Sequence, residues 1–322
     1  MSLRDDFAAP FERLGEGEAA TLLEQVYGIG SARLRRLDTE RDDSFEVTTA
    51  SGSYVLKVAH PDDDPLYVNL QSAALSYASE LAPTLPLQRL LLSREGEVEV
   101  SVEVGVSTRV VRLLTWLPGV PVFERPPDRN GMEALGATLG RLTSALSSFD
   151  HPAAHRDFVW DAARLPLVAD LRPAYPCAEI DAAFALFEAN AALIAGLPQQ
   201  VIHNDFHPGN VLVDEEGTVT GVLDFGDVVH TARVVDLAVA LSYLRTPRGI
   251  ADTTPFVEGF ESAVRLTPEE HEALPILIAA RLIERTLVNL TLARGNPDAR
   301  DDAQHGAEAN RAALAALLEE IG

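Results

Sequence analysis

Lysine is almost absent from this chain. The sequence has 26 lysine and arginine residues, and Lys57 is the only lysine among them. Cysteine is equally scarce, and the single Cys177 excludes an internal disulfide and any metal site built from several cysteines. No apolar run approaches the roughly 20 residues that span a bilayer, so we expect no membrane partner. With 322 residues, 47% of them hydrophobic, the composition is that of a globular protein with a large core.

Positive charge is scarce as well, and the formal net charge is −23. No basic run is available to neutralise phosphates, so nucleic acid is disfavoured as a partner. An acidic field favours a cationic substrate, although the same acidity commonly serves only solubility. The N-terminal stretch MSLRDDFAAPFE has acids where a signal peptide has its apolar core, so we expect a cytoplasmic protein.

Strand patterns dominate residues 30–117. Two runs, SFEVTTA and SYVLKVA, flank Ser51-Gly52, which predicts a hairpin turn. The stretches EVEVSVEVG and STRVVRLLTWL follow as further predicted strands. Between these strands, Pro65 to Ser79 has apolar residues at helical spacing.

Helical patterns dominate after Leu117-Pro118-Gly119, and one strand-rich island at residues 201–227 interrupts them. The sequence therefore predicts an α+β protein with a small β-rich lobe over residues 1–117 and a larger, mostly helical lobe over 118–322. A short hinge is expected near residues 114–119. The amphipathic helices are predicted at 130–147, 179–195, 252–264, 267–292 and 302–320.

Lys57 lies in the predicted strand YVLKVAH, whose two faces are otherwise apolar. A buried ammonium without a partner is costly in free energy, so it must meet a carboxylate or a bound phosphate. Lysine suits a pocket too tight for a planar guanidinium, because its ammonium is a compact charge on a flexible stem. The alternative is an edge strand whose lysine reaches water, and position alone does not decide between the two.

The island at 201–227 carries the strongest chemical signal. Asn210 stands just before one predicted strand and Asp224 just after the next, and a hairpin would bring these two ends together. An amide oxygen and a carboxylate could then share one Mg²⁺, with phosphate and water completing its shell. Asp205, on the loop leading in, could accept the proton of an attacking hydroxyl. These are the parts that phosphoryl transfer needs, because positioning and charge neutralisation do most of the work.

Two motifs in this island, HNDFHPGN and DFGD, resemble the catalytic loop and the metal-binding motif of the kinase-like phosphotransferases. The similarity is to the aminoglycoside phosphotransferase and choline kinase superfamily, and VLDFGDVVHTARVVDLAVA resembles its hydroxylysine kinase branch. The turn ERDDSF at 40–45 resembles the segment that covers the phosphates. The resemblance extends over roughly residues 25–245 and implies a bilobal, protein-kinase-like fold.

The resemblance implies a role for each of these residues. It implies that Asp205 is the catalytic base, that Asn210 and Asp224 are Mg²⁺ ligands, and that Lys57 holds the α- and β-phosphates of a nucleoside triphosphate. It further implies that the N-terminal lobe binds the nucleotide and that the C-terminal lobe is catalytic and binds the acceptor. Backbone groups at the hinge, from Leu114 to Leu117, would meet the base, and the donor could be ATP or GTP.

Two departures from the kinase pattern stand out. The helix glutamate that usually pairs with the strand lysine is replaced by Gln71, which is expected to hydrogen-bond Lys57 without neutralising it. A glycine-rich loop is missing, so Ser44 and backbone amides of the preceding turn would have to cover the phosphates. Either this branch tolerates the amide, or the protein is a nucleotide-binding pseudoenzyme. The intact triad of Asp205, Asn210 and Asp224 favours an enzyme.

The acceptor is expected to be a small molecule with a hydroxyl group. The twelve residues from Asp224 to Asp236 are too few for an activation segment that docks a peptide, so no protein substrate is expected. The resemblance implies a hydroxylysine-like acceptor, and other amino-alcohol or aminoglycoside kinases are the alternative. An amino acid acceptor would need acids for its ammonium and an arginine for its carboxylate. The candidates are Asp227, His230, Trp160, Asp161, Arg281, Glu284 and Arg285.

Overall fold

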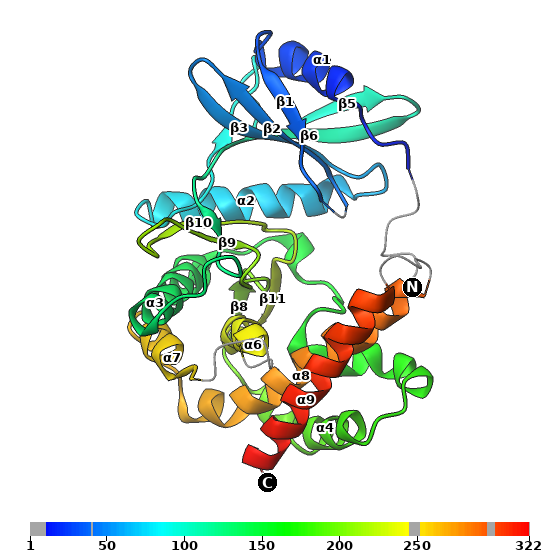
Figure 1. Cartoon of the computed structure of the whole chain (residues 1–322), viewed down its shortest axis with the longest axis vertical. Helices are drawn as coiled ribbons and strands as arrows, with labels where there is room; N and C mark the ends of the chain where they lie inside the picture. Colours follow the sequence, from blue (N-terminus) through cyan, green and yellow to red (C-terminus); the bar gives the residue numbers. More distant parts are fainter. Residues whose placement is uncertain (1–10, 40, 245–251, 295–299, 322) are drawn as a thin grey trace. The chain divides into compact units, whose positions relative to one another are not determined.

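The computed structural model of the chain describes residues 11–39, 41–244, 252–294 and 300–321. By its internal contacts the chain divides into two compact units, Met1–Pro118 (unit 1) and Gly119–Gly322 (unit 2). Unit 1 is rich in strands and unit 2 is mainly helical (Figure 1). The predicted α+β class, with strands in the N-terminal part and helices in the C-terminal part, is confirmed.

Unit 1 is built on an antiparallel sheet with the strand order β1-β2-β3-β6-β4, in which β5 also pairs with β6. The predicted hairpin connects β2 to β3, and Gly52 adopts a φ of 152° at its turn. Only glycine accepts such a backbone without strain. The strands are β1 (Arg33–Arg36), β2 (Asp43–Thr49), β3 (Gly52–Val58), β4 (Leu90–Leu91), β5 (Val100–Val104) and β6 (Ser107–Thr115).

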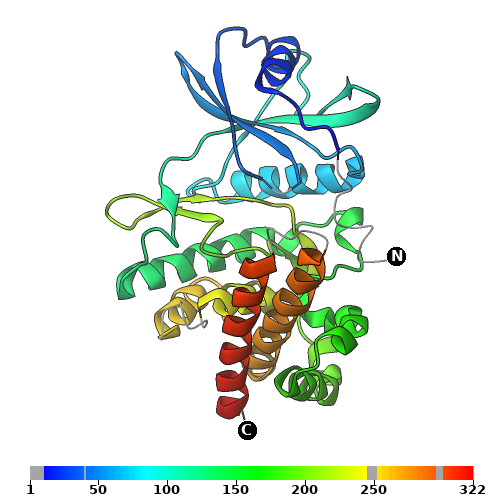
Figure 2. The same ribbon diagram turned by 45° about the vertical axis from the view of Figure 1, so that its right-hand side comes forward.

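Helices cover both faces of this sheet (Figures 1 and 2). On one face, Leu56 and Val58 of β3 pack with Leu22 and Leu23 of α1 (Glu16–Tyr27) in a buried cluster. On the other face, Ala59, which directly follows β3, and Val110 of β6 pack with Val68 of α2 (Pro65–Leu81). Because side chains alternate along a strand, Lys57 lies on the face that α2 covers.

Helix α1 was not predicted from the sequence, although its signals are present. Ala19, Leu22, Leu23 and Val26 are buried at helical spacing, and the Glu18 carboxylate accepts a hydrogen bond from the backbone N–H of Gly15 (2.8 Å). A carboxylate at this position satisfies one of the N–H groups that a helix start leaves free. Helix α2 agrees with the prediction.

Two small antiparallel sheets lie in unit 2, at residues that flank the motifs. The hairpin predicted between Asn210 and Asp224 is confirmed, since β9 (Val211–Val213) pairs with β10 (Val219–Val222) and Gly217 turns at a φ of 81°. β7 (Val120–Pro121) pairs with the other side of β9. The second sheet pairs β8 (Gln199–Ile202) with β11 (Val229–Ala232).

The five helices predicted in unit 2 are present, one of them in two parts, whereas α6, η2 and η3 lie outside the predicted ranges. The helix predicted over 179–195 is interrupted at Asn190, which separates α4 from α5. The segment η3 was not predicted and is a 3₁₀ helix, because Pro166 and Pro173 lack the N–H groups that a regular helix needs. The helices are α3 (Arg129–Ala145), η1 (Leu146–Ser148), η2 (Pro152–Ala154), η3 (Ala162–Ala174), α4 (Ala178–Ala189), α5 (Ala191–Ala195), α6 (Val234–Leu244), α7 (Thr254–Glu261), α8 (Pro268–Ala293) and α9 (Arg300–Ile321).

Helices α8 and α9 lie side by side in both views, and α3 packs on α7 (Figures 1 and 2). The α3–α7 contact depends on glycine: a Cβ atom at Gly136 would collide with the Phe256 carbonyl, and one at Gly259 would collide with the Glu133 carbonyl. The two backbones can therefore approach only because these side chains are absent. Within the described ranges, no helix is both long and apolar enough to cross a membrane.

Gly136→Ala is expected to destabilise unit 2 by about 1–3 kcal/mol, the usual cost of forcing atoms into a filled core. Gly306→Ala is the matched control, because Gly306 lies in α9 and a Cβ there meets nothing within 4 Å. Alanine is the better helix former, so the control should gain about 0.5–1 kcal/mol. Urea denaturation of both variants measures the difference. Equal stability of the two would contradict the close packing of α3 on α7.

Candidate active site

A buried carboxylate, Asp236 at the start of α6, holds the loop that follows β8. It accepts hydrogen bonds from the backbone N–H groups of Asn204 (2.7 Å) and His203 (3.4 Å) and from the Thr143 hydroxyl (2.9 Å). Asn204 is held in the left-handed region at a φ of 65°, an uncommon conformation for a residue with a side chain. The loop is thus fixed by a side chain 32 residues further along the chain.

His203 braces the same loop from inside. Its Nδ1 accepts a hydrogen bond from the Asp205 backbone N–H (3.2 Å), so Nε2 carries the proton and donates to the Leu223 carbonyl (3.1 Å). Burial lowers the pKa of His203 to about 4, and the ring is therefore neutral at physiological pH. These contacts give His203 a structural role that links the loop to the end of β10.

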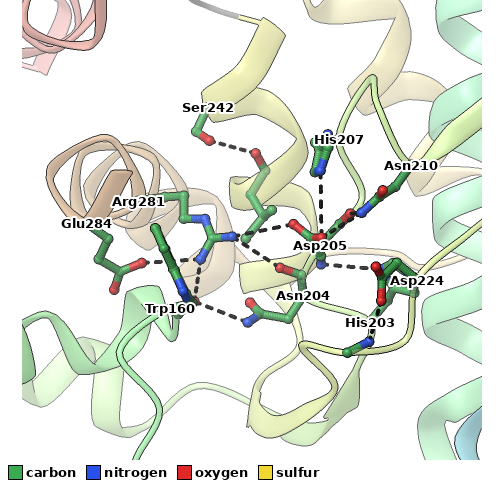
Figure 3. Close-up of polar contacts among 12 residues, drawn as sticks. Trp160, His203, Asn204, Asp205, His207, Asn210, Asp224, Ser242, Arg281 and Glu284 are labelled. Atoms are coloured by element: carbon green, nitrogen blue, oxygen red, sulfur yellow. Dashed lines mark hydrogen bonds and ion pairs between the residues drawn. The ribbon is translucent and has the colours of Figure 1, made fainter. Parts of the chain in front are cut away.

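Asp205 is the central side chain of the site (Figure 3). Its Oδ2 accepts a short hydrogen bond from Asn210 Nδ2 (2.6 Å), and its Oδ1 lies 3.8 Å from Arg281 Nη2. Its side chain is 20% exposed, and His207 Nε2 lies 3.7 Å from Oδ2. The predicted base and the predicted metal ligand Asn210 are therefore in direct contact.

Burial raises the pKa of Asp205 well above the ordinary value, and the nearby charge of Asp227 raises it further. The charge of Arg281 opposes this rise. A raised carboxyl pKa is typical of groups that exchange protons in catalysis. Asp227, which lies just past the predicted metal motif, is therefore near enough to Asp205 for its charge to act on it.

The β9–β10 hairpin brings the two predicted metal ligands together. The N–H of Leu223 donates to the Asn210 carbonyl (2.8 Å), so Asp224 is the residue next to a direct backbone pair of Asn210. Asp224 adopts a φ of 59°, and its Oδ1 accepts a hydrogen bond from the Gly226 N–H (2.9 Å). This turn fixes the orientation of the carboxylate.

The donor set agrees with a site for Mg²⁺. Across the described part of the chain, no group of three or more His, Cys, Asp or Glu side chains is arranged to hold a metal ion. Asn210 donates its amide N–H to Asp205, so its side-chain oxygen is the atom that would bind a cation together with the Asp224 carboxylate. One amide and one carboxylate are a usual protein share for Mg²⁺ when phosphate oxygens and water complete the shell.

Arg281 of α8 is buried beside Asp205 and is held by protein groups (Figure 3). Its Nη1 donates to the Trp160 carbonyl (2.6 Å) and lies 3.5 Å from Glu284 Oε2, and its guanidinium stacks 4.9 Å from the centre of the Trp160 ring. Burial raises the pKa of Glu284 well above the ordinary value. Three of the predicted substrate residues therefore form one network with the base.

The other predicted substrate residues either lie apart from this network or make contacts that stabilise the fold. Asp161 is buried, and its Oδ1 accepts hydrogen bonds from Thr231 Oγ1 (2.7 Å) and from the Ala163 N–H at the start of η3. His230 stacks on His155 with ring centres 4.3 Å apart. Asp161 and His230 both line a cavity of about 640 Å³ whose walls do not include Asp205. Arg285 stacks on Tyr243 and donates to the Ser242 carbonyl.

In unit 1, Lys57 does not have the partner that the sequence predicted. Lys57 Nζ lies 3.9 Å from Asp42 Oδ2, and Gln71 Oε1 accepts its hydrogen bond from Arg112 Nη1 (3.0 Å) instead. The prediction that Gln71 would hydrogen-bond Lys57 is therefore wrong. The physical reason is that Arg112, on the neighbouring strand, reaches α2 and takes the amide oxygen.

The other residues predicted to contact the nucleotide are Ser44, Leu114 and Leu117, and they lie in different parts of unit 1. Ser44 lies in β2 directly opposite Lys57. Leu114 lies inside the sheet, where it pairs with Val55 and Leu90, whereas Leu117 follows the end of β6. Their contacts with a nucleotide stay predictions.

Sequence reasoning missed Asp42 and Arg112, although the signal for Arg112 was available. STRVVRLLTWL places two arginines, Arg109 and Arg112, inside an otherwise apolar strand, much as Lys57 lies in its own strand. Arg112 was overlooked because arginine is common in this chain and lysine is not. The contact between Arg281 and Asp205 left no signal, because 76 residues separate them in sequence.

One protein family and two kinds of kinase are similar to this chain in sequence. Its residues 33–274 match the family model described as the phosphotransferase enzyme family. Hydroxylysine kinase from Mus musculus is 27% identical over 305 residues, which cover 83% of this chain and 79% of that protein. Homoserine kinase from Gluconacetobacter diazotrophicus is 26% identical over 279 residues, covering 82% and 83% of the two chains.

Solved structures share the fold over nearly the whole chain. A microcompartment-associated aminopropanol kinase superimposes with a TM-score of 0.75 at 20% identity, covering 94% of this chain and 98% of its own. An amicoumacin kinase in complex with AMP-PNP and Ca²⁺ gives a TM-score of 0.72 at 17% identity, covering 94% and 93%. The expected kinase-like fold is thereby confirmed.

The Asp236 anchor leads to a prediction about stability and pH. Burial raises the pKa of Asp236 to about 6, so the folded state holds this proton more tightly than the unfolded chain. The stabilisation by this proton is present at low pH and is lost as the pH rises through about 6. Asp236→Asn cannot titrate. The stability of the wild type relative to this variant should therefore increase by about 1.4 kcal/mol between pH 7.5 and pH 5.0.

Urea denaturation of the wild type and of Asp236→Asn at both pH values measures this change. A difference between the two proteins that stays constant with pH would contradict the raised pKa.

Proposed function

Because the chain belongs to the phosphotransferase enzyme family and is a small-molecule kinase, we propose that it transfers the γ-phosphate of ATP or GTP to a hydroxyl of a small, amine-bearing acceptor. The resemblance carried by HNDFHPGN and DFGD, including that to the hydroxylysine kinase branch, is confirmed by these relatives. The proposal concerns the donor, the acceptor and the roles of individual residues.

The contact between Asp205 and Asn210 carries the proposal. In this proposal Asp205 accepts the proton of an attacking hydroxyl, and the 2.6 Å hydrogen bond from the Asn210 amide orients its carboxylate. Asn210 and Asp224 would hold Mg²⁺, which supplies positive charge to the phosphates when it is bound. The rest of the catalytic effect comes from fixing these groups before the acceptor arrives.

Arg281 supports the base electrostatically. Its Nη2 lies 3.8 Å from Asp205 Oδ1, and its charge counteracts the rise in the pKa of Asp205 that burial and Asp227 cause. A base must be ionised to accept a proton, so Arg281 favours the working state of Asp205. Arg281 also donates hydrogen bonds to the Trp160 and Asn204 carbonyls, and these bonds hold the loop in place.

The charge of the site favours an acceptor with an ammonium group. Asp205, Asp224 and Asp227 are close enough for the last two to raise the pKa of Asp205. Mg²⁺ would offset Asp224, and an ammonium on the acceptor would offset Asp227 and lower the pKa of the base. The names hydroxylysine kinase, homoserine kinase and aminopropanol kinase all denote acceptors with a hydroxyl and an amine. Hydroxylysine is the first candidate, and other amino alcohols and aminoglycosides follow.

The first experiment measures nucleoside diphosphate release by the purified chain with Mg²⁺, using ATP and GTP separately. The acceptors are 5-hydroxylysine, homoserine, 1-amino-2-propanol and an aminoglycoside panel, with 1,2-propanediol as the matched alcohol without an amine. Release should depend on an amine-bearing acceptor, and the diol should be poor because it brings no positive charge to offset the carboxylates around Asp205. Chelation of Mg²⁺ should abolish release.

Asp205→Asn is the blank for this assay and should lower turnover by about 10²–10⁴-fold, the usual contribution of a general base. Retained transfer in this variant would remove Asp205 from the role of base. Tight nucleotide binding without turnover on any acceptor would instead favour the pseudoenzyme, in which Gln71 in place of a helix glutamate marks a lost activity.

Lys57→Arg should leave the fold intact and lower kcat by about 10²-fold, the scale at which one electrostatic contact to developing charge acts. The bulkier, planar guanidinium cannot take the position of a compact ammonium. Circular dichroism and steady-state kinetics measure the two effects separately. Near-native turnover would contradict the assignment of Lys57 to the phosphates.

A further inference from the structure

Lys57 does not stand alone in unit 1, because a second cation lies directly beside it. The β3–β6 register places Arg112 opposite Lys57, and the β2–β3 register places Ser44 opposite Lys57 on the other side. Directly paired residues of an antiparallel sheet project to the same face. Ser44, Lys57 and Arg112 therefore form one row across three neighbouring strands, on the face that α2 covers.

One carboxylate oxygen is shared by the two cations. Asp42 Oδ2 lies 3.9 Å from Lys57 Nζ and 3.7 Å from Arg112 Nη2, and both distances exceed that of a hydrogen bond. Gln71 is neutral and accepts from Arg112 at 3.0 Å. These four side chains thus carry two positive charges and one negative charge, and a largely buried cluster of this kind favours a further anion.

Hydrogen-bond donors in this row are left without acceptors. Ser44 Oγ and Arg112 Nε are buried, and neither has a hydrogen-bond partner within the described residues. The residues are 1% and 4% exposed, so water does not readily replace the missing partners. An anion with several oxygens would satisfy such donors, whereas one carboxylate oxygen at more than 3.5 Å does not.

The neighbouring Asp43, the first residue of β2, is a carboxylate with a purely structural set of partners, and it differs from Asp42 in this respect. Asp43 is fully buried and accepts hydrogen bonds from Arg36 (2.7 Å) and from the Leu14 N–H (3.2 Å), with Arg109 Nη1 at 2.9 Å. Burial raises the pKa of Asp43, but these partners outweigh it and hold the pKa below the ordinary value. Asp42 has no such set of short contacts.

The backbone of Asp42 is nevertheless held firmly. Its carbonyl accepts hydrogen bonds from Arg13 Nη1 (2.8 Å) and from Thr39 Oγ1 (2.7 Å). The Asp42 carboxylate, 17% exposed, can therefore turn away by rotation of its own side chain while the turn stays in place.

We propose that Arg112 is a second phosphate-binding cation beside Lys57, and that the Asp42 carboxylate is an exchangeable counter-ion which the phosphates of the donor nucleotide displace. The inference rests on the proposed function, since it needs a nucleoside triphosphate as donor. It also accounts for Gln71: a glutamate there would neutralise Arg112 and remove the excess positive charge, whereas glutamine orients the guanidinium without neutralising it.

The test is isothermal titration of the full chain with MgATP and MgGTP, and with adenosine and guanosine as ligands without phosphate. Arg112→Gln should weaken triphosphate binding at least tenfold and leave nucleoside binding unchanged. Asp42→Asn should strengthen triphosphate binding several-fold, because the competing carboxylate is gone. Arg35→Gln is the matched control, since it removes the same charge from an exposed pair with Glu46 and should change neither.

Gln71→Glu should weaken triphosphate binding several-fold, because the new carboxylate pairs with Arg112. If Arg112→Gln fails to fold, Asp42→Asn and Gln71→Glu still decide the matter, since they must shift binding in opposite directions. Weaker binding by Asp42→Asn, or stronger binding by Gln71→Glu, would overturn the proposal.

Failure of the proposed function can be distinguished from failure of the proposal on Arg112 and Asp42. A wild-type chain that binds no nucleoside triphosphate and phosphorylates no acceptor would overturn the proposed function and this inference with it. A wild type that phosphorylates its acceptor, with an Arg112→Gln variant that binds the triphosphate equally well, would overturn this inference alone.

Discussion

The buried carboxylate of Asp236 is the contact on which the arrangement around Asp205 depends. By accepting the N–H groups of His203 and Asn204, it stabilises a loop in which Asn204 has a left-handed backbone. That conformation turns the chain so that Asp205 meets Asn210 and the Asn204 carbonyl meets Arg281. Without an acceptor at position 236, the buried N–H groups of His203 and Asn204 would lose this hydrogen-bond partner, and the loop conformation would be destabilised.

The charge around Asp205 is unbalanced in the opposite direction to the charge around Lys57, and this imbalance supports the proposed function. Around Asp205, the acids Asp224 and Asp227 raise the pKa of the base, so a metal ion and an acceptor ammonium would both bind favourably there. Around Lys57, two cations share one loosely held carboxylate, so an anion is favoured. The proposed transfer to a small amine would need both tendencies, because its reactants are a polyphosphate, a divalent cation and a cationic acceptor.

Local patterns predicted much of the fold because they depend on neighbours in sequence. The β2–β3 and β9–β10 hairpins, helix α2 and the long helix α8 follow from alternation and helical spacing. The misses also have local causes: prolines made η3 a 3₁₀ helix, and a break at Asn190 divided the helix predicted over 179–195. The motifs were sufficient to identify the family because they lie close in sequence: Asp205 and Asn210 share one loop, and a short hairpin sets the spacing from Asn210 to Asp224.

The sequence by itself determined which residues are candidates for the chemistry, since the motif spacing and the isolated Lys57 can be recognised without coordinates. Only the tertiary structure decided which partners these residues have. Arg281 reaches Asp205 from a distant helix, Asp42 rather than Gln71 faces Lys57, and Arg112 becomes its neighbour through strand register. The physical reason is that a charge interacts with whatever lies within a few ångströms of it, and contacts between distant segments are set by packing, which no local pattern encodes.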